Sequence, residues 1–139
     1  MKKTLTMVVL LLVLCTASAW AQLKDGQWEI TTQVQIAGMQ QQMPPTTFRQ
    51  CMTKSDPVAK NQDKSYDCKT TSLKMSGNMV NYTVTCTGKE GEMQTTGKST
   101  YTGNTMDGSA TTSFKMKGQP AMQMTSKMSG KYIGPCPNK

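Results

Sequence analysis

Apolar and polar residues alternate along most of the chain from residue 26 onward. In the first alternating segment, every second side chain falls on one face: Trp28, Ile30, Thr32, Val34 and Ile36. A period of two residues over ten positions is typical of a β-strand with one buried face. The same alternation returns at residues 80–86, 93–101, 110–116 and 122–132. The pattern therefore predicts a chain built mainly of half-buried strands.

Short turn sequences separate these segments: Ser76-Gly77-Asn78, Gly88-Lys89-Glu90-Gly91, Gly103-Asn104 and Gly118-Gln119-Pro120. Met43-Pro44-Pro45 ends the first strand and leads into a short strand at residues 47–52. Residues 57–64 alone favour a turn or two of helix. We therefore predict an all-β fold class, a single antiparallel meander of about seven strands forming a small barrel or a curved half-barrel.

The tetrapeptide Lys-Met-Ser-Gly occurs at residues 74–77 and 127–130, and Lys-Met-Lys-Gly occurs at 115–118. In each copy we expect the lysine to point outward, the methionine to point inward and the glycine to relax the backbone. Gly130 falls inside a long strand, where a glycine favours a bend or a bulge. The repeat thus indicates repeated strand structure rather than a repeated functional site.

The first residues are typical of a secretory signal peptide. Lys2 and Lys3 precede an apolar run at residues 5–14, and Ala19-Trp20-Ala21 fits a small-x-small cleavage site. That run is too short to span a membrane as a helix. We therefore predict a signal peptide at residues 1–21 and a single β domain at residues 22–139 of an exported, periplasmic or secreted protein.

Cysteine usage agrees with export. Four cysteines follow residue 21, namely Cys51, Cys68, Cys86 and Cys136, and an even number in a small exported domain predicts two disulfides. Alternating strand directions favour the pairs Cys68–Cys86 and Cys51–Cys136. However, a two-residue turn at Gly77-Asn78 would place Cys68 on the opposite face from Cys86. The pairing Cys51–Cys68 with Cys86–Cys136 therefore stays open.

The charge is basic. Without Lys2 and Lys3, 14 basic residues face 8 acidic ones, which leaves a net charge of +6. In an exported protein this excess favours an anionic envelope component or an acidic protein partner over nucleic acid. It is equally typical of a surface kept soluble by lysine.

The composition argues against an enzyme. The chain contains no histidine, which is the commonest general base and metal ligand. Glu90 and Glu92 share a strand face but lie beside a turn, where solvated carboxylates are common. No serine or threonine has a visible activating partner. We therefore expect a non-enzymatic protein with no cofactor.

Methionine is unusually frequent. After residue 21 there are 11 methionines, as many as Leu, Ile, Val and Phe together. The favoured interpretation is that methionine fills the core in place of aliphatic residues. The alternative is a periplasmic Cu(I) site made of thioethers, which are soft ligands. Its candidate ligands are Met39 and Met43 in a loop and Met122 and Met124 on one strand face.

A methionine-lined barrel interior also suits a small apolar ligand. The aromatic residues expected to line it are Trp28, Tyr82, Tyr101, Phe114 and Tyr132. The alternative is an interior filled by side chains. The sequence thus favours an exported binding or envelope-associated protein whose partner is a small apolar ligand or another protein.

The order of several short motifs resembles a family of small exported bacterial proteins catalogued as domain of unknown function 3617. They are Gly26-Gln27-Trp28-Glu29, Met43-Pro44-Pro45, Cys51-Met52-Thr53, Cys68, Ser76-Gly77-Asn78, Val80-Asn81-Tyr82-Thr83-Val84-Thr85-Cys86, Gly97, Tyr101-Thr102-Gly103-Asn104 and Ser129-Gly130-Lys131-Tyr132-Ile133-Gly134-Pro135-Cys136. The family often has tryptophan at the position of Tyr82 and aspartate at that of Asn104. The resemblance implies a bacterial envelope protein with a signal peptide and paired cysteines, and it supplies no active site.

Overall fold

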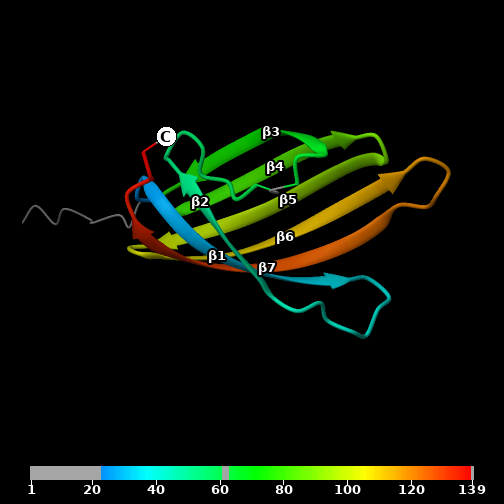
Figure 1. Cartoon of the computed structure of the whole chain (residues 1–139), viewed down its shortest axis with the longest axis horizontal. Coiled ribbons are helices and arrows are strands. Elements are labelled where there is room, and N and C mark those ends of the chain that lie inside the picture. Colours follow the sequence, from blue (N-terminus) through cyan, green and yellow to red (C-terminus); the bar gives the residue numbers. More distant parts are fainter. Residues whose placement is uncertain (1–22, 61–62, 139) are drawn as a thin grey trace, which may run out of the picture.

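The computed structural model describes residues 23–60 and 63–138. The signal peptide predicted at residues 1–21 lies outside this part of the chain. The strands are β1 (Gly26–Ile36), β2 (Thr46–Met52), β3 (Tyr66–Ser76), β4 (Met79–Gly88), β5 (Gly91–Thr102), β6 (Thr105–Met116) and β7 (Met122–Gly134). They form one antiparallel sheet in the order β2-β1-β7-β6-β5-β4-β3, curled into a half-barrel (Figure 1). The predicted all-β meander of about seven strands is confirmed, and the described residues contain no helix.

The core lies on the concave face of this sheet. Val80, Tyr82, Val84 and Cys86 occupy every second position of β4 and are buried, and their partners on β5 are buried or half-buried, while the β4 residues between them are half-buried or exposed. The buried residues include Trp28, Ile30, Val80, Tyr101 and Met106. The alternation in the sequence therefore reports the two faces of the curled sheet.

Small residues on the concave face make room for large ones. A Cβ atom added at Gly97 would lie 2.6 Å from the hydroxyl oxygen of Tyr82, whose ring packs over that glycine. A Cβ atom added at Gly130 would lie 3.1 Å from the methyl carbon of Met106 and 3.6 Å from Cε3 of Trp28. The register of β7 with both neighbours is regular at Gly130, so β7 has no bulge there. The glycine serves close packing instead.

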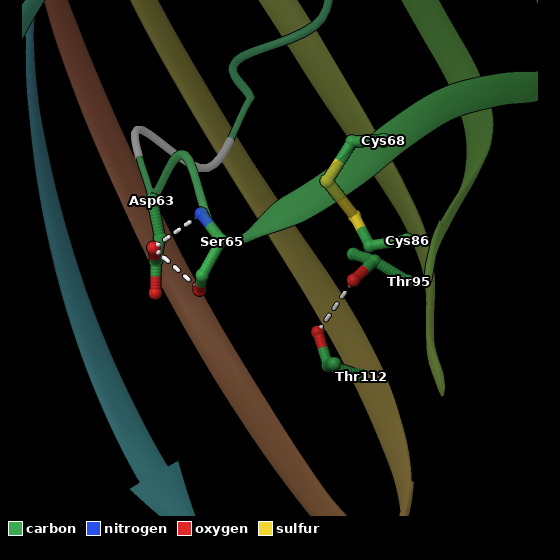
Figure 2. Close-up of a disulfide and its surroundings, with 6 residues drawn as sticks. All are labelled: Asp63, Ser65, Cys68, Cys86, Thr95 and Thr112. Carbon is green, nitrogen blue, oxygen red and sulfur yellow. Dashed lines mark hydrogen bonds between the residues drawn. A yellow bond between two sulfur atoms is a disulfide. The ribbon is translucent and has the colours of Figure 1, made fainter. Parts of the chain in front are cut away.

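A β-bulge in β3 explains how two of the cysteines meet. The turn at Gly77-Asn78 has two residues, and it pairs Leu73 with Tyr82. The register then shifts between Thr70 and Ser72, so that Cys68 lies opposite Cys86. A bulge inserts one extra residue on one strand, so the side chains on its far side from the turn point to the opposite face from the one they would otherwise take. Cys68 and Cys86 therefore share the concave face and form a disulfide (Figure 2).

The second disulfide joins Cys51 to Cys136, 85 residues apart in the chain. Cys51 lies in the edge strand β2, and Cys136 follows the end of β7, two strands away. This bond ties β2 to the end of the chain across the start of β1. The pairs are thus the ones that the strand directions favour.

Residues 53–60 and 63–65 belong to the connection between the two edges of the sheet, since β2 and β3 are its outer strands. We call these residues the seam segment; they lie over the concave face (Figure 1). Pro57 and Val58 are buried against the core, with Val58 1% exposed. A half-barrel that its own strands leave open is thus partly closed by a loop.

Two side chains hold the seam segment in place. The Gln50 amide donates a hydrogen bond to the carbonyl oxygen of Val58 (3.1 Å) and accepts one from the backbone N–H of Lys60 (3.0 Å). The buried Tyr101 hydroxyl donates to the carbonyl oxygen of Pro57 at 2.6 Å. Nearer β3, the Asp63 carboxylate accepts hydrogen bonds from the N–H and hydroxyl of Ser65, which lower the pKa of Asp63 (Figure 2). Polar contacts therefore fix a segment that lacks strand pairing.

Among residues 23–60 and 63–138, no helix has the length and hydropathy needed to cross a membrane.

Replacing Tyr101 with phenylalanine tests two contributions of this side chain to the free energy of unfolding, namely its hydrogen bond to Pro57 and the burial of its neutral phenol. Loss of the hydrogen bond to Pro57 leaves a buried carbonyl group without its donor, and we expect the free energy of unfolding at neutral pH to fall by about 1–3 kcal/mol. Burial raises the pKa of Tyr101 above its ordinary value of 10.0. The stability contributed by the neutral phenol is therefore fully present below about pH 10 and is lost as the pH rises toward the pKa of the folded state.

Denaturant unfolding of both proteins at neutral pH and just above about pH 10 measures these effects. The wild-type protein should lose more stability between the two conditions than Tyr101→Phe does. Equal alkaline losses in the two proteins would contradict the placement of this phenol in the core.

Candidate functional site

A cavity of about 350 Å³ lies on the concave face beside the seam segment. Its wall includes Thr32, Phe48, Tyr82, Ala110, Ser126 and Met128 from five strands, together with Ala59 and Lys60 of the seam segment. The volume falls at the lower end of the range for small-molecule sites. The cavity is the part of the half-barrel interior that the side chains and the seam segment leave open.

A row of small residues across the sheet gives this cavity its depth. Gly97 on β5, Ala110 on β6 and Ser126 on β7 lie side by side in register, and Tyr82 on β4 is the partner of Gly97. The Tyr82 ring lies low over Gly97, where no side chain lifts it away from the sheet. Ala110 and Ser126 therefore contribute little volume at this level, and the hollow lies above them, beside the Tyr82 ring.

The wall of the cavity combines an apolar floor with hydroxyl groups. Thr95 lines it as well and shares a 2.8 Å hydrogen bond with the Thr112 hydroxyl (Figure 2). Burial raises the pKa of Tyr82, and a hydrogen bond with Ser99 opposes that shift, so its phenol is neutral at physiological pH. The charged group in the wall is the Lys60 ammonium, which pairs with Asp56 at 2.7 Å. Such a site suits a mainly apolar molecule with a polar end.

The five aromatic residues expected to line a ligand site occupy three different places. Trp28 and Tyr101 are 0% and 1% exposed, and their ring centroids lie 5.5 Å apart in an edge-to-face contact. Tyr132 packs on Trp28 at 5.8 Å, and the indole N–H donates to the carbonyl oxygen of Lys24. These three rings fill one end of the half-barrel.

The remaining two aromatic residues lie elsewhere. Phe114 is half-buried and contacts Tyr66, with 6.5 Å between the ring centroids, near the Cys68–Cys86 disulfide. Tyr82 alone among the five lines the cavity beside the seam segment. Sequence reasoning missed Gly97, Ala110 and Ser126, because their importance lies in being small at one level of three paired strands. Once the strand register is known, the three small residues at inward positions of neighbouring strands become visible as a group.

A second cavity, of about 380 Å³, lies around the turn between β3 and β4. Its wall includes Leu23, Val80 and Tyr101, but also the long side chains of Lys54 and Met75. Met75 is 49% exposed because it lies on the edge strand β3. Long, rotamer-rich side chains must be ordered before they can hold a ligand. The cavity beside the seam segment takes most of its wall from strand residues, and it is therefore the candidate site.

The four methionines considered as metal ligands lie at one corner of the sheet. Met39 and Met43 belong to the loop between β1 and β2 and are 57% and 48% exposed. Their backbone N–H groups donate to the carbonyl oxygens of Ile36 and Val34, at the end of β1. Met124 is the register partner of Ile36, and Met122 lies two residues before it on the same face of β7. The backbone therefore brings the loop and the β7 methionines to the same end of the fold.

Other metal-binding side chains do not gather in the described part of the chain. Within it, no group of three or more His, Cys, Asp or Glu residues is placed to hold an ion. All four cysteines that follow residue 21 are engaged in the two disulfides.

Comparison with known proteins identifies the family of this chain and gives no further information about it. Neither the curated proteins nor the solved structures contain a match to this chain. The family model described as "Protein of unknown function (DUF3617)" matches residues 23–136, which are nearly all of the predicted β domain. The motifs from Gly26 to Cys136 that resemble this family are spread over the same span. The chain therefore belongs to the DUF3617 family.

Proposed function

We propose that this protein is an exported, non-enzymatic binding protein that holds a small apolar ligand in the cavity beside the seam segment. The observation that carries the proposal is the pair of small inward residues, Ala110 and Ser126, that line an open volume of about 350 Å³ beside the Tyr82 ring, which lies low over Gly97. Filling this level with larger side chains would have stabilised the core, since apolar burial is the dominant favourable term in folding. A fold that leaves the space open is suited to a ligand that fills it.

Two further features support this proposal. The two disulfides are of a kind that persists in oxidising compartments such as the periplasm, which agrees with export. The cavity wall offers hydroxyl groups and one lysine–aspartate pair. No arrangement of a nucleophile with a base is present in that wall, and the chain has no histidine to serve as one. The site is therefore better suited to holding a molecule than to transforming it.

Filling the cavity should abolish binding without unfolding the protein. Ser126→Phe projects a ring into the cavity, whereas Thr125→Phe places the same ring on the exposed outer face of β7. We expect the apolar dye N-phenyl-1-naphthylamine to bind the wild-type protein and Thr125→Phe at one site. Ser126→Phe should bind it at least about tenfold more weakly, a loss of about 1.4 kcal/mol.

Fluorescence titration measures the binding, and thermal unfolding followed by circular dichroism shows whether each variant is folded. Equal dye binding by a folded Ser126→Phe variant would place the ligand site elsewhere. No dye binding by the wild-type protein would argue against an apolar site altogether.

A second candidate function is Cu(I) binding at the corner that holds Met39, Met43, Met122 and Met124. The observation that favours it is the hydrogen bond from the Ala37 N–H to the Gln123 carbonyl oxygen at 3.0 Å. This contact joins the start of the loop to β7 between Met122 and Met124. Thioether sulfur is a ligand suited to Cu(I), and three of the four side chains are exposed. A copper ion would need at least three of the sulfurs to converge.

Pairwise replacement by leucine tests this site with little change in side-chain volume. Under the copper hypothesis, Met39→Leu with Met122→Leu should lower Cu(I) affinity by about tenfold or more, or about 1.4 kcal/mol. The matched control is Met75→Leu with Met79→Leu, which removes two exposed methionines at the opposite end of the sheet. Competition with a chromogenic Cu(I) chelator measures the affinity. Equal affinity in the two double variants would rule this corner out as the copper site.

A further inference from the structure

Three lysines lie in one row across the convex face of the sheet. Lys74 on β3 is opposite Asn81 on β4, which is opposite Lys98 on β5. Lys98 is opposite Ser109 on β6, and Ser109 is opposite Lys127 on β7. All five residues are exposed. Because neighbouring strands lie about 4.8 Å apart, successive lysines of this row are about 10 Å apart at the backbone.

The three lysines of this row form no ion pair with an acid of the described residues, although Asp107 lines a shallow depression together with Lys98 and Lys127. The ion pairs within residues 23–60 and 63–138 are Arg49–Glu29, Lys60–Asp56 and Lys69–Asp67. Asp107 lies two residues from Ser109 on the same face, but it forms no ion pair with Lys98 or Lys127 in that described part. The row therefore presents three positive charges to solvent at a regular spacing.

Hydroxyl groups lie directly beside the lysine row. Thr96, Thr111 and Thr125 occupy the next outward positions of β5, β6 and β7 and are register partners of one another. A shallow depression of about 390 Å³ is lined by these threonines together with Lys98, Ser109 and Lys127. The aromatic and most of the large apolar residues of these strands point to the concave face instead. The convex surface thus combines positive charge with hydroxyl donors and acceptors.

The shape of the sheet decides which kind of anion fits. The lysine row runs from strand to strand, which is the direction in which the half-barrel curls. A flat lipid surface would touch the crest of this curve, and the lysines on either side would fall away from it. A flexible linear polymer can follow the curve and place negative groups at several lysines, while its hydroxyl groups meet the threonines.

We propose that the convex face binds a linear anionic polysaccharide, with its carboxylates against Lys74, Lys98 and Lys127 and its hydroxyl groups against Thr96, Thr111 and Thr125. This site is separate from the concave cavity, so each can be tested without the other. An exposed ion pair contributes only about 0.2–1 kcal/mol, so the polymer gains affinity by engaging several lysines at once.

Polygalacturonate serves as the probe, and affinity electrophoresis or calorimetry of the full mature protein serves as the measurement. Replacing Lys74, Lys98 and Lys127 by glutamine should weaken binding about tenfold at low salt. The matched control replaces Lys64, Lys89 and Lys117 by glutamine, since these lysines lie in loops and turns outside the row. This control should change polygalacturonate binding less than about twofold. The losses in both triple variants should shrink near about 0.5 M salt, because the Debye length is then shorter than the spacing between the lysines.

A single substitution tests the row more finely. Ser109→Asp places a carboxylate directly between Lys98 and Lys127, and it should weaken polygalacturonate binding severalfold, whereas Thr102→Asp at the end of β5 should not. Equal losses in the two triple variants would overturn the proposal, because net charge alone would explain them. Row-dependent binding to phosphatidylglycerol vesicles without binding to polygalacturonate would overturn it in favour of a lipid surface. No binding of the wild-type protein to polygalacturonate would also overturn it.

Discussion

The packing of large rings onto small residues of the concave face determines the form of this molecule. Tyr82 lies over Gly97, and Trp28 lies with Met106 over Gly130, so that bulky side chains rest low against the curled sheet. These rings and three buried methionines, Met52, Met106 and Met128, share the core with a few aliphatic residues. Where the rings meet, the half-barrel is filled, and where the small residues Ala110 and Ser126 lie side by side, it is hollow. Core and candidate site thus follow from one arrangement of side-chain sizes.

The open seam of the sheet makes the seam segment part of both the core and the site. Because β2 and β3 do not pair with each other, their interior side would be exposed without a covering element. Pro57 and Val58 provide that cover at one end, and Ala59 and Lys60 form a wall of the cavity immediately beyond it. A loop that is held by side-chain hydrogen bonds rather than by a strand ladder opens at lower cost than the sheet does.

Strand number, strand type and most turns could be predicted from the sequence, because alternation and turn residues are local signals. The disulfide register could not, since it depends on a bulge at Thr71 that no local signal marks. The candidate site was also beyond sequence reasoning, because Gly97, Ala110 and Ser126 become one level only when three strands are aligned. Trp28 and Tyr101 were expected to line a ligand site, whereas the structure buries them against each other. Alternation in the sequence shows that both point inward, but it does not show which inward residues meet.

The most direct test of the account is native mass spectrometry of the protein purified gently from the cells that naturally make it. The account predicts a chain about four hydrogens lighter than its fully reduced form, since each of the two disulfides removes two hydrogens, together with a noncovalent organic adduct. Collisional activation should remove that adduct and leave the disulfides intact. A chain of the predicted mass that carries no adduct, even after exposure to envelope lipid extracts, would contradict the claim that the half-barrel holds a small apolar ligand.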